Sequence, residues 1–328
     1  MKKIILAITL FVVAHTHTQA QQDPRFSQYM FNQLVLNPAY TGTTDALSLS
    51  LLGRYQWVGI EGSPQTGTLS GHLPLGDDRK AGVGAYLAYD KIGVTQTTAF
   101  YGSYAYKFIL GESRLSVGLN GGVSYLSTDD SQLQTNPIMD PITGDPVFQQ
   151  GSLSRLLPNF GLGLYFYKPN KYYMGVSAPH LLNNNLRDEE ATIALTAKQY
   201  RQYNFMAGGV IGQGVLKFRP SVLVKAVPTN APVQVDLSAM FLIKDMLWLG
   251  GSYRTAVGNK NEAGATQAIG TESADAIVGF QFQNGLRISY AYDLTLSQLQ
   301  QYTSGSHEIM IGYDLKSKGV RYRTPRYF

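Results

Sequence analysis

The stretch VQVDLSAMFLI, residues 233–243, predicts a β-strand because its side chains alternate in character. Apolar side chains stand at every second position from Val233 to Ile243, and Gln234, Asp236 and Ser238 stand between them. A period of two places the two sets on opposite faces of a β-strand. One face therefore suits lipid or a protein core, and the other suits water.

The same alternation recurs along the chain, for example at residues 216–226, 286–292 and 309–313. A tilted strand needs about 9 to 11 residues to cross a bilayer, and an even number of strands returns both ends of the chain to one side. We predict an all-β protein, a transmembrane antiparallel β-barrel over residues 46–315. Its fourteen predicted strands lie at residues 46–57, 64–73, 80–90, 95–110, 113–126, 157–168, 171–180, 199–212, 215–227, 233–243, 246–256, 274–283, 285–293 and 306–315.

The connections between these strands predict the orientation of the barrel. Bacterial barrels have short periplasmic turns and longer outward loops. The predicted periplasmic turns are Pro74–Arg79, Gly111-Glu112, Pro169-Asn170, Gln213-Gly214, Lys244-Asp245 and Asn284-Gly285. The long outward connections are Ser127–Leu156, Leu181–Gln202, Val257–Ser273 and Leu294–Gly305. Asn284-Gly285 also predicts a type I′ turn, in which both residues have positive φ.

The composition favours a membrane barrel with aromatic rims. The chain has 34 Gly and 22 Tyr, and only 15% of its residues are charged. Rings near strand ends suit the lipid headgroup zone. The alternative is a soluble β-sandwich, whose apolar face points inward. The rings expected at the rims are those of Tyr55, Trp57, Tyr104, Tyr106, Tyr165, Phe166, Tyr167, Tyr172 and Tyr173.

The two ends of the chain are predicted to lie outside the barrel wall. Lys2-Lys3, an apolar run to Ala14 and a polar stretch ending at Ala20 form the layout of a secretory signal, residues 1–20. Residues 21–45 are too rich in Asn, Gln and Pro for a strand and are expected to form a periplasmic plug or cap. Residues 316–328 carry no acidic residue and are expected as a basic periplasmic tail. Its proposed docking residues are Lys316, Lys318, Arg321, Arg323, Arg326 and Phe328; the alternative is a disordered tail.

Chemistry that would indicate an enzyme is sparse. Cysteine is absent, and His72, His180 and His307 stand at no catalytic or metal-ligand spacing. Without Lys2 and Lys3 the chain has 25 basic and 22 acidic residues, a net charge of +3 that indicates no nucleic-acid partner. We predict no catalytic residues, no cofactor and no metal. For the loop carboxylates Asp129, Asp130, Asp140 and Asp145 we predict a solvated loop shaped by proline, because they lack the regular spacing of a calcium loop; calcium binding is the alternative.

Charged residues of both signs fall on the polar faces of the predicted strands. Mixed charges in a lumen pair into a filled interior more often than they line an open ion path. The sequence therefore predicts a plugged or narrow barrel. The charged residues concerned are Lys217, Arg219, Lys225, Arg287, Asp236, Asp293, Glu308 and Asp314.

The stretches QDPRFSQYMFN, residues 22–32, and LNPAY, residues 36–40, resemble the opening of the PorP/SprF family of type IX secretion outer-membrane proteins. The likeness continues in the family's order through RYQWVG (54–59), PQT (64–66), SAPHLL (177–182), WLGGSYR (248–254), YAYD (290–293), GSHEIM (305–310) and TPRYF (324–328). The candidate motif residues of the opening are Phe26, Tyr29, Met30, Phe31, Asn37, Pro38 and Tyr40.

The resemblance implies a protein of the cell outer membrane, in contact with its lipid. Members work with the periplasmic ring and trans-envelope complex, and help to secrete or retain cargo proteins that carry a C-terminal sorting domain. In gliding bacteria the cargo is often a large surface adhesin. The alternative function is transport of a small hydrophobic molecule through a fourteen-stranded barrel with an N-terminal hatch.

Overall fold

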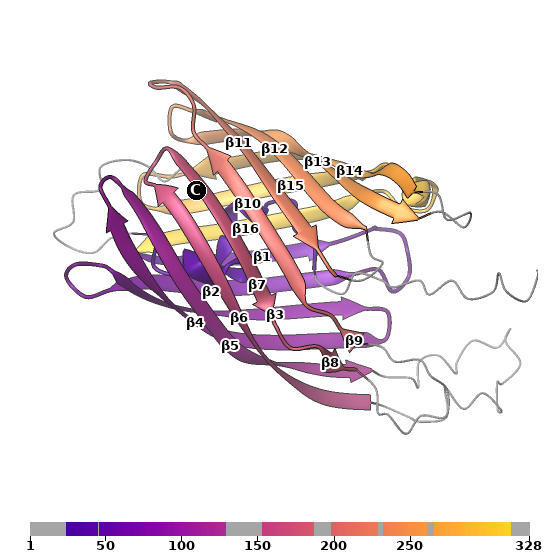
Figure 1. Cartoon of the computed structure of the whole chain (residues 1–328). Helices are drawn as coiled ribbons and strands as arrows, with labels where there is room; N and C mark the ends of the chain where they lie inside the picture. The colour runs from indigo at the N-terminus through magenta and orange to yellow at the C-terminus, as the bar shows by residue number, and fades with distance from the viewer. Residues whose placement is uncertain are drawn as a thin grey trace, which may run out of the picture.

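The computed structural model describes residues 24–44, 46–128, 153–186, 198–228, 232–260 and 266–315. Within these residues, fourteen antiparallel strands form one closed up-and-down barrel (Figure 1), which confirms the predicted class and strand number. A separate two-stranded sheet pairs β8 (Asn184–Asn185) with β9 (Lys198–Gln199), and a 3-10 turn, η4 (Gln298–Gln301), precedes the last strand. The barrel strands are β1 (Leu47–Tyr55), β2 (Gln65–Leu75), β3 (Ala81–Ile92), β4 (Thr95–Leu110), β5 (Ser113–Thr128), β6 (Leu153–Lys168), β7 (Tyr172–His180), β10 (Gln202–Gly209), β11 (Leu216–Ala226), β12 (Val233–Ile243), β13 (Leu247–Lys260), β14 (Thr266–Gln281), β15 (Leu286–Thr295) and β16 (Ser306–Leu315).

The first and last strands close the barrel. β1 pairs with β16 from Leu47 opposite Leu315 to Tyr55 opposite His307. Closure satisfies the backbone of both strands and leaves no open sheet edge. Among the described residues, no helix is both long and apolar enough to cross a membrane.

The wall has the polarity of a membrane barrel, because its apolar side chains face outward. On β12, Leu237 is 50% exposed and Phe241 is 42% exposed, whereas Gln234 and Asp236 are buried. A soluble sandwich would bury the apolar set instead. The alternation in residues 233–243 therefore separates a lipid-facing surface from a polar lumen.

The two ends of the barrel differ in their connections. The turn end carries the short connections 76–80, 111–112, 169–171, 210–215, 244–246 and 282–285, together with the start of β1 and the end of β16. The loop end carries the other connections, including β8, β9 and η4. Each of these six connections follows the strand after which the sequence predicted it.

One predicted turn type is wrong. Of the pair Asn284-Gly285, only Gly285 has positive φ, at 97°. The hairpin closes between Phe282 and Leu286, where the Phe282 amide donates to the Leu286 carbonyl over 2.7 Å, so the connection is longer than two residues. Positive φ at two successive residues occurs instead at Lys244 (53°) and Asp245 (54°), as a type I′ turn requires.

The predicted loop Val257–Ser273 is also wrong, because strand pairing continues through much of it. β13 extends to Lys260 and β14 begins at Thr266, with Val257 opposite Ile269. This part of β14 is rich in polar residues, so hydrophobic alternation does not reveal it. The predicted loop Leu181–Gln202 likewise contains β8 and β9.

Three of the rings expected at the membrane rims lie inside the barrel. Tyr165, Tyr167 and Tyr173 are each no more than 3% exposed and belong to the buried cluster. Tyr104 and Tyr172, in contrast, are 43% and 42% exposed on the outer surface. Both groups stand near strand ends, so position along a strand does not separate them. The face of the strand does.

Several predictions lie outside the described residues. They are the signal at residues 1–20, the carboxylates of the loop after β5 (Asp129, Asp130, Asp140 and Asp145) and the basic tail at residues 316–328.

Candidate functional site: the N-terminal segment in the barrel lumen

Residues 24–44, here called the N-terminal segment, lie inside the barrel, where their short helical turns appear in indigo between its walls (Figure 1). The Pro24 carbonyl accepts a hydrogen bond of 3.1 Å from Lys225, near the loop end of β11. The Gly42 carbonyl accepts one from Lys107, near the turn end of β4. The segment thus crosses the lumen from the loop end to the turn end. Only its last residues lie at the end that the sequence assigned to the periplasm.

Three short turns shape the segment: η1 (Tyr29–Phe31), α2 (Gln33–Leu36) and η2 (Pro38–Tyr40). Asn37 caps η2, because its side-chain oxygen accepts the Ala39 amide over 2.9 Å. Pro38 stands at the first position of that turn. A backbone N–H at this position would have no partner within the turn, so proline loses no hydrogen bond there. The NPAY motif therefore makes its capping hydrogen bond within its own four residues.

Glycines in the wall let this capped turn approach the strands. A Cβ added to Gly118 on β5 would collide with the backbone of Pro38 and Ala39. One added to Gly163 on β6 would collide with the Asn37 side chain. Asn37 also donates to the Leu164 carbonyl over 3.0 Å, so the turn is bonded to the strand it touches. Glycine is the residue that permits such close backbone approach.

A buried carboxylate holds the start of the segment. The two oxygens of Glu308 on β16 accept the amides of Ser27 (2.9 Å) and Gln28 (2.8 Å). Arg54 on β1 donates to the same carboxylate over 3.2 Å and to the Ser27 hydroxyl over 2.7 Å. The Arg54 and Glu308 side chains are 1% and 0% exposed. Charge-assisted hydrogen bonds between buried groups are the strong kind.

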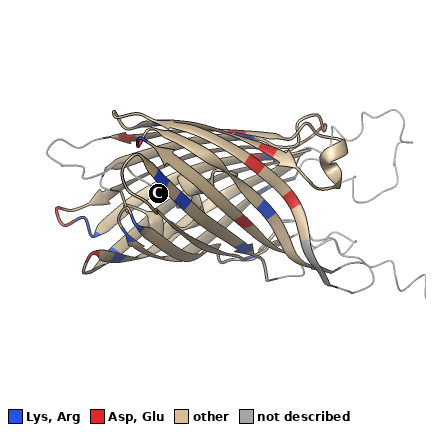
Figure 2. Ribbon diagram, turned by 90° about the horizontal axis from the view of Figure 1, so that it is seen from above, with Lys and Arg blue, Asp and Glu red and all other residues tan. Residues whose placement is uncertain are grey.

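The ion pairs continue across neighbouring strands. Arg54 forms an ion pair with Asp293 on β15 over 2.7 Å. Asp293 forms a second ion pair with Arg254 on β13 over 3.3 Å. Arg254 pairs with Asp236 of β12 over 2.5 Å and donates to the Phe26 carbonyl over 3.4 Å. Figure 2 shows such charged positions as a few coloured segments on the strands of the barrel. The network therefore links the backbone of residues 26–28 to five barrel strands.

Arg219 on β11 has a different environment. Its guanidinium lies 5.3 Å from the centre of the Phe31 ring and 5.5 Å from that of Trp248, and it donates to the Met30 carbonyl over 3.2 Å. The residue is 1% exposed, and it forms no ion pair with a described carboxylate. Cation–π contacts gain strength in such a water-excluded place. Arg219 thus fastens η1 to the wall through rings and a carbonyl.

Apolar side chains of the segment complete the packing. Phe26, Tyr29, Met30 and Leu36 are each no more than 4% exposed and belong to the largest buried cluster. Tyr40 is half-buried and packs edge-to-face on Tyr165 with ring centres 5.5 Å apart. Full burial of each such side chain contributes about 1.5 to 3 kcal/mol.

The structure brings together all seven candidate residues of the opening motif. Phe26, Tyr29, Met30, Asn37 and Pro38 are buried, and Phe31 and Tyr40 are half-buried against Trp248 and Tyr165. The six candidate residues of the tail lie outside the described residues.

Sequence reasoning missed Arg54 and Arg254 as members of the charged network. Both stand on the polar face of their strands, two residues after another inward-facing side chain, so alternation alone would have placed them in the lumen. Of the charged residues predicted to pair inside, Asp236, Asp293 and Glu308 join the network. Asp314 instead pairs with Arg287 over 3.5 Å.

Among the described residues, no group of three His, Asp or Glu side chains gathers in one place. Ser306 and Glu308 face the lumen, whereas His307 faces outward and bonds the Tyr290 hydroxyl over 2.6 Å. The contacts in the lumen thus bind the N-terminal segment of the same chain to the barrel wall.

Comparison with known proteins gives the family. A family model described as "Type IX secretion system membrane protein PorP/SprF" matches residues 18–313. The chain belongs to the PorP/SprF family. This PorP/SprF protein is located in the outer membrane, as its family and its closed barrel show. No curated protein sequence matches the chain.

Solved structures share the fold of this PorP/SprF barrel. A FadL homologue of Pseudomonas aeruginosa is 13% identical, with a TM-score of 0.50, over 90% of this chain and 95% of that one. The toluene transporter TbuX of Ralstonia pickettii is 10% identical, with a TM-score of 0.51, over 86% of this chain and 93% of that one. At these identities the likeness concerns the fold alone.

Proposed function

We propose that this protein is an outer-membrane component of the type IX secretion and gliding machinery that anchors surface cargo or helps to export it, and that links to the periplasmic ring complex. The cargo class is a protein with a C-terminal sorting domain. Family membership supports the assignment to the secretion system. The observation that carries the choice of an anchor over an open pore is the N-terminal segment bound across the lumen.

The N-terminal segment acts as a plug in this proposal. Its residues hydrogen-bond to twelve of the fourteen barrel strands within the described part of the chain. A hatch that opens for each transported molecule would have to break many of these buried bonds, and each one left unmade costs about 1 to 3 kcal/mol. The plug therefore serves as a fixed support for the wall and for partners at both ends.

Partners would contact the protein at its two ends. Loops carried on a rigid scaffold are the usual place for binding, so the cargo site is assigned to the loop end, including the connection between β7 and β10. The basic tail follows β16 from the turn end, where its cations and Phe328 would dock on an acidic face of the ring complex.

The decisive experiment replaces residues 182–200 with a short turn, which keeps the backbone pair His180 and Gln202 that closes β7 on β10. We expect normal barrel insertion, judged by heat-modifiable mobility on a gel, together with loss of cargo from the cell surface. A matched control replaces the loop-end connection 227–232 in the same way. Unchanged cargo display in the first variant, or equal loss in the control, would refute this placement. Pull-down of the intact envelope complex tests the link to the ring.

Transport of a small hydrophobic molecule is the second candidate, and one observation favours it. The chain shares its barrel fold with TbuX, which is a toluene transporter, and with the FadL homologue. Conductance in planar bilayers and uptake by cells separate the two functions. The anchor predicts neither in the intact protein.

A further inference from the structure

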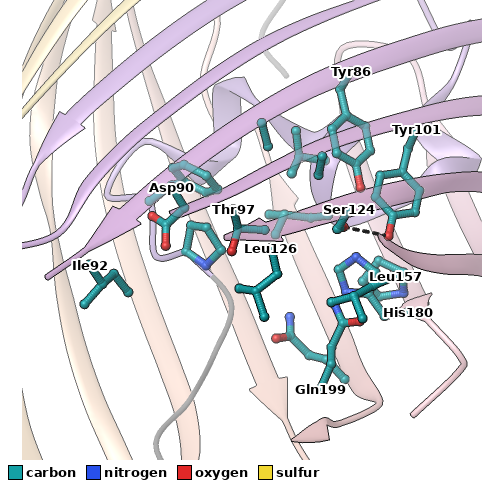
Figure 3. Close-up of a pocket in the computed structure, with 18 of the residues that line it drawn as sticks. Tyr86, Asp90, Ile92, Thr97, Tyr101, Ser124, Leu126, Leu157, His180 and Gln199 are labelled. Atoms are coloured by element: carbon teal, nitrogen blue, oxygen red, sulfur yellow. Dashed lines mark hydrogen bonds between the residues drawn. The ribbon is translucent and has the colours of Figure 1, made fainter. Parts of the chain in front are cut away.

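A cavity of about 360 Å³ lies in the half of the lumen nearest the loop end (Figure 3). Its walls come from β3 to β7 together with β10 and β11. Phe26, Val35 and Leu36 of the N-terminal segment line it as well. The lining runs from Tyr86 and Tyr101 near mid-strand to Ile92 and Thr95 at the loop end.

Small inward-facing residues create this space. Ala88 on β3, Ala99 on β4 and Ser124 on β5 stand opposite one another in the register, so three neighbouring strands present short side chains at one level. The next inward position toward the turn end carries Tyr86 and Tyr101 instead. The hollow thus follows from the sequence of three strands and not from a gap between them.

The deep wall of the cavity is aromatic. Tyr86 and Tyr101 stack with ring centres 5.2 Å apart and an angle of 16° between their planes. Tyr101 also meets the His180 ring at 5.5 Å, and its hydroxyl lies 3.3 Å from the Ser124 hydroxyl. Figure 3 shows Tyr86, Tyr101 and His180 along one side of the recess. Ring faces and edges of this kind favour a flat aromatic partner.

The outer part of the cavity is more polar. Asp90 and Thr97 stand opposite each other one level nearer the loop end than Ala88 and Ala99. Gln199, Gln202 and Lys225 line the same space. A ligand with an apolar body and one polar substituent would thus bury its body against the rings and leave the substituent among hydrogen-bonding groups.

We propose that this cavity is a binding site for a small aromatic molecule carrying one polar substituent. Mostly apolar sites of about 300 to 1,000 Å³ with a few convergent polar groups are typical of small-molecule binding. The cavity lies in the lumen, and its deep wall is formed by the Tyr86 and Tyr101 rings near mid-strand. A folded protein domain is too large to reach these rings. The proposal does not depend on the anchoring of cargo.

The test uses the full mature chain in phosphatidylcholine nanodiscs, with empty nanodiscs as the background for partition into lipid. The probes are 2-naphthol and decahydro-2-naphthol, which share a carbon skeleton and a hydroxyl but differ in aromaticity. Binding is measured by saturation-transfer difference NMR. The filled variant is Ala88→Phe with Ala99→Phe, and its matched control is Leu87→Phe, since Leu87 is a lipid-facing neighbour that is 46% exposed.

We expect a protein-dependent signal for 2-naphthol that falls by about tenfold in the filled variant and persists in the Leu87→Phe control. The saturated probe should give a clearly weaker signal. Equal signals in the wild-type and filled proteins, equal signals from both probes, or none above empty nanodiscs would overturn the proposal. Heat-modifiable mobility shows that each variant is folded. Cargo display is read separately, so failure here leaves the anchoring function standing.

Discussion

Replacing Glu308 by glutamine should release the start of the N-terminal segment without unfolding the barrel. The carboxylate accepts the Ser27 and Gln28 amides and the Arg54 guanidinium at 2.9, 2.8 and 3.2 Å. Glutamine has nearly the same shape, but it offers one acceptor oxygen and directs an NH₂ group at a donor. Arg54 keeps its ion pair with Asp293, so the damage stays local.

The size of the effect follows from these contacts. Leaving a buried donor without its charged hydrogen-bond partner costs up to about 3 kcal/mol. A local destabilisation of about 3 kcal/mol corresponds to a change of roughly a hundredfold in the opening equilibrium.

Hydrogen exchange measured by mass spectrometry provides the assay. Peptides covering residues 24–32 should exchange roughly a hundredfold faster in Glu308→Gln, whereas peptides from β2 should be unchanged. The matched control is Asp314→Asn on the same strand, because Asp314 bonds Ser48 and Arg287 of the wall. If Glu308→Gln exchanges like the wild type, or Asp314→Asn exchanges as fast, then the carboxylate does not hold the segment.

Three further predictions concern the segment and the tail. Arg219→Met removes the cation–π contacts with Phe31 and Trp248, which are worth about 2 kcal/mol. In a Trp57→Phe background, acrylamide should therefore quench the fluorescence of Trp248 more strongly. Unchanged quenching would show that Arg219 does not hold η1 against the wall. Deletion of residues 24–44 should lower the temperature of barrel unfolding on gels and open a conductance in planar bilayers, and a closed, equally stable barrel would disprove the plug. Deletion of residues 316–328 should leave insertion normal but abolish co-purification of periplasmic partners at low salt, and unchanged co-purification at both low and high salt would rule out charge-based docking.

Strand number and class were predictable because lipid imposes a strict period of two on the outward face. The apolar set of residues 233–243 faces lipid as a direct result. The same reasoning fails for residues 266–273 of β14, because their sequence is rich in polar residues and lacks the apolar alternation. Backbone hydrogen bonds extend the strand there, and the amino-acid composition does not reveal such bonds.

The candidate site was predictable only in part. The opening motif pointed to the N-terminal segment, and its local NPAY turn follows from capping rules. Its partners did not follow, because Glu308 binds the backbone of Ser27 from 281 positions away. A backbone amide looks the same at every residue, so sequence gives no sign of which one a distant carboxylate will meet.

The bonds from Glu308 to the segment also constrain the order of folding. The segment precedes β1 in the chain, while its carboxylate partner lies on β16, the strand that closes the barrel against β1. Once that seam has formed, the turns around Tyr29 can enter the lumen only through an end of the barrel. The strand that closes the barrel is thus also the one whose Glu308 holds the enclosed segment. Contacts of such long sequence separation are slow to form, so closure should be the late step of assembly.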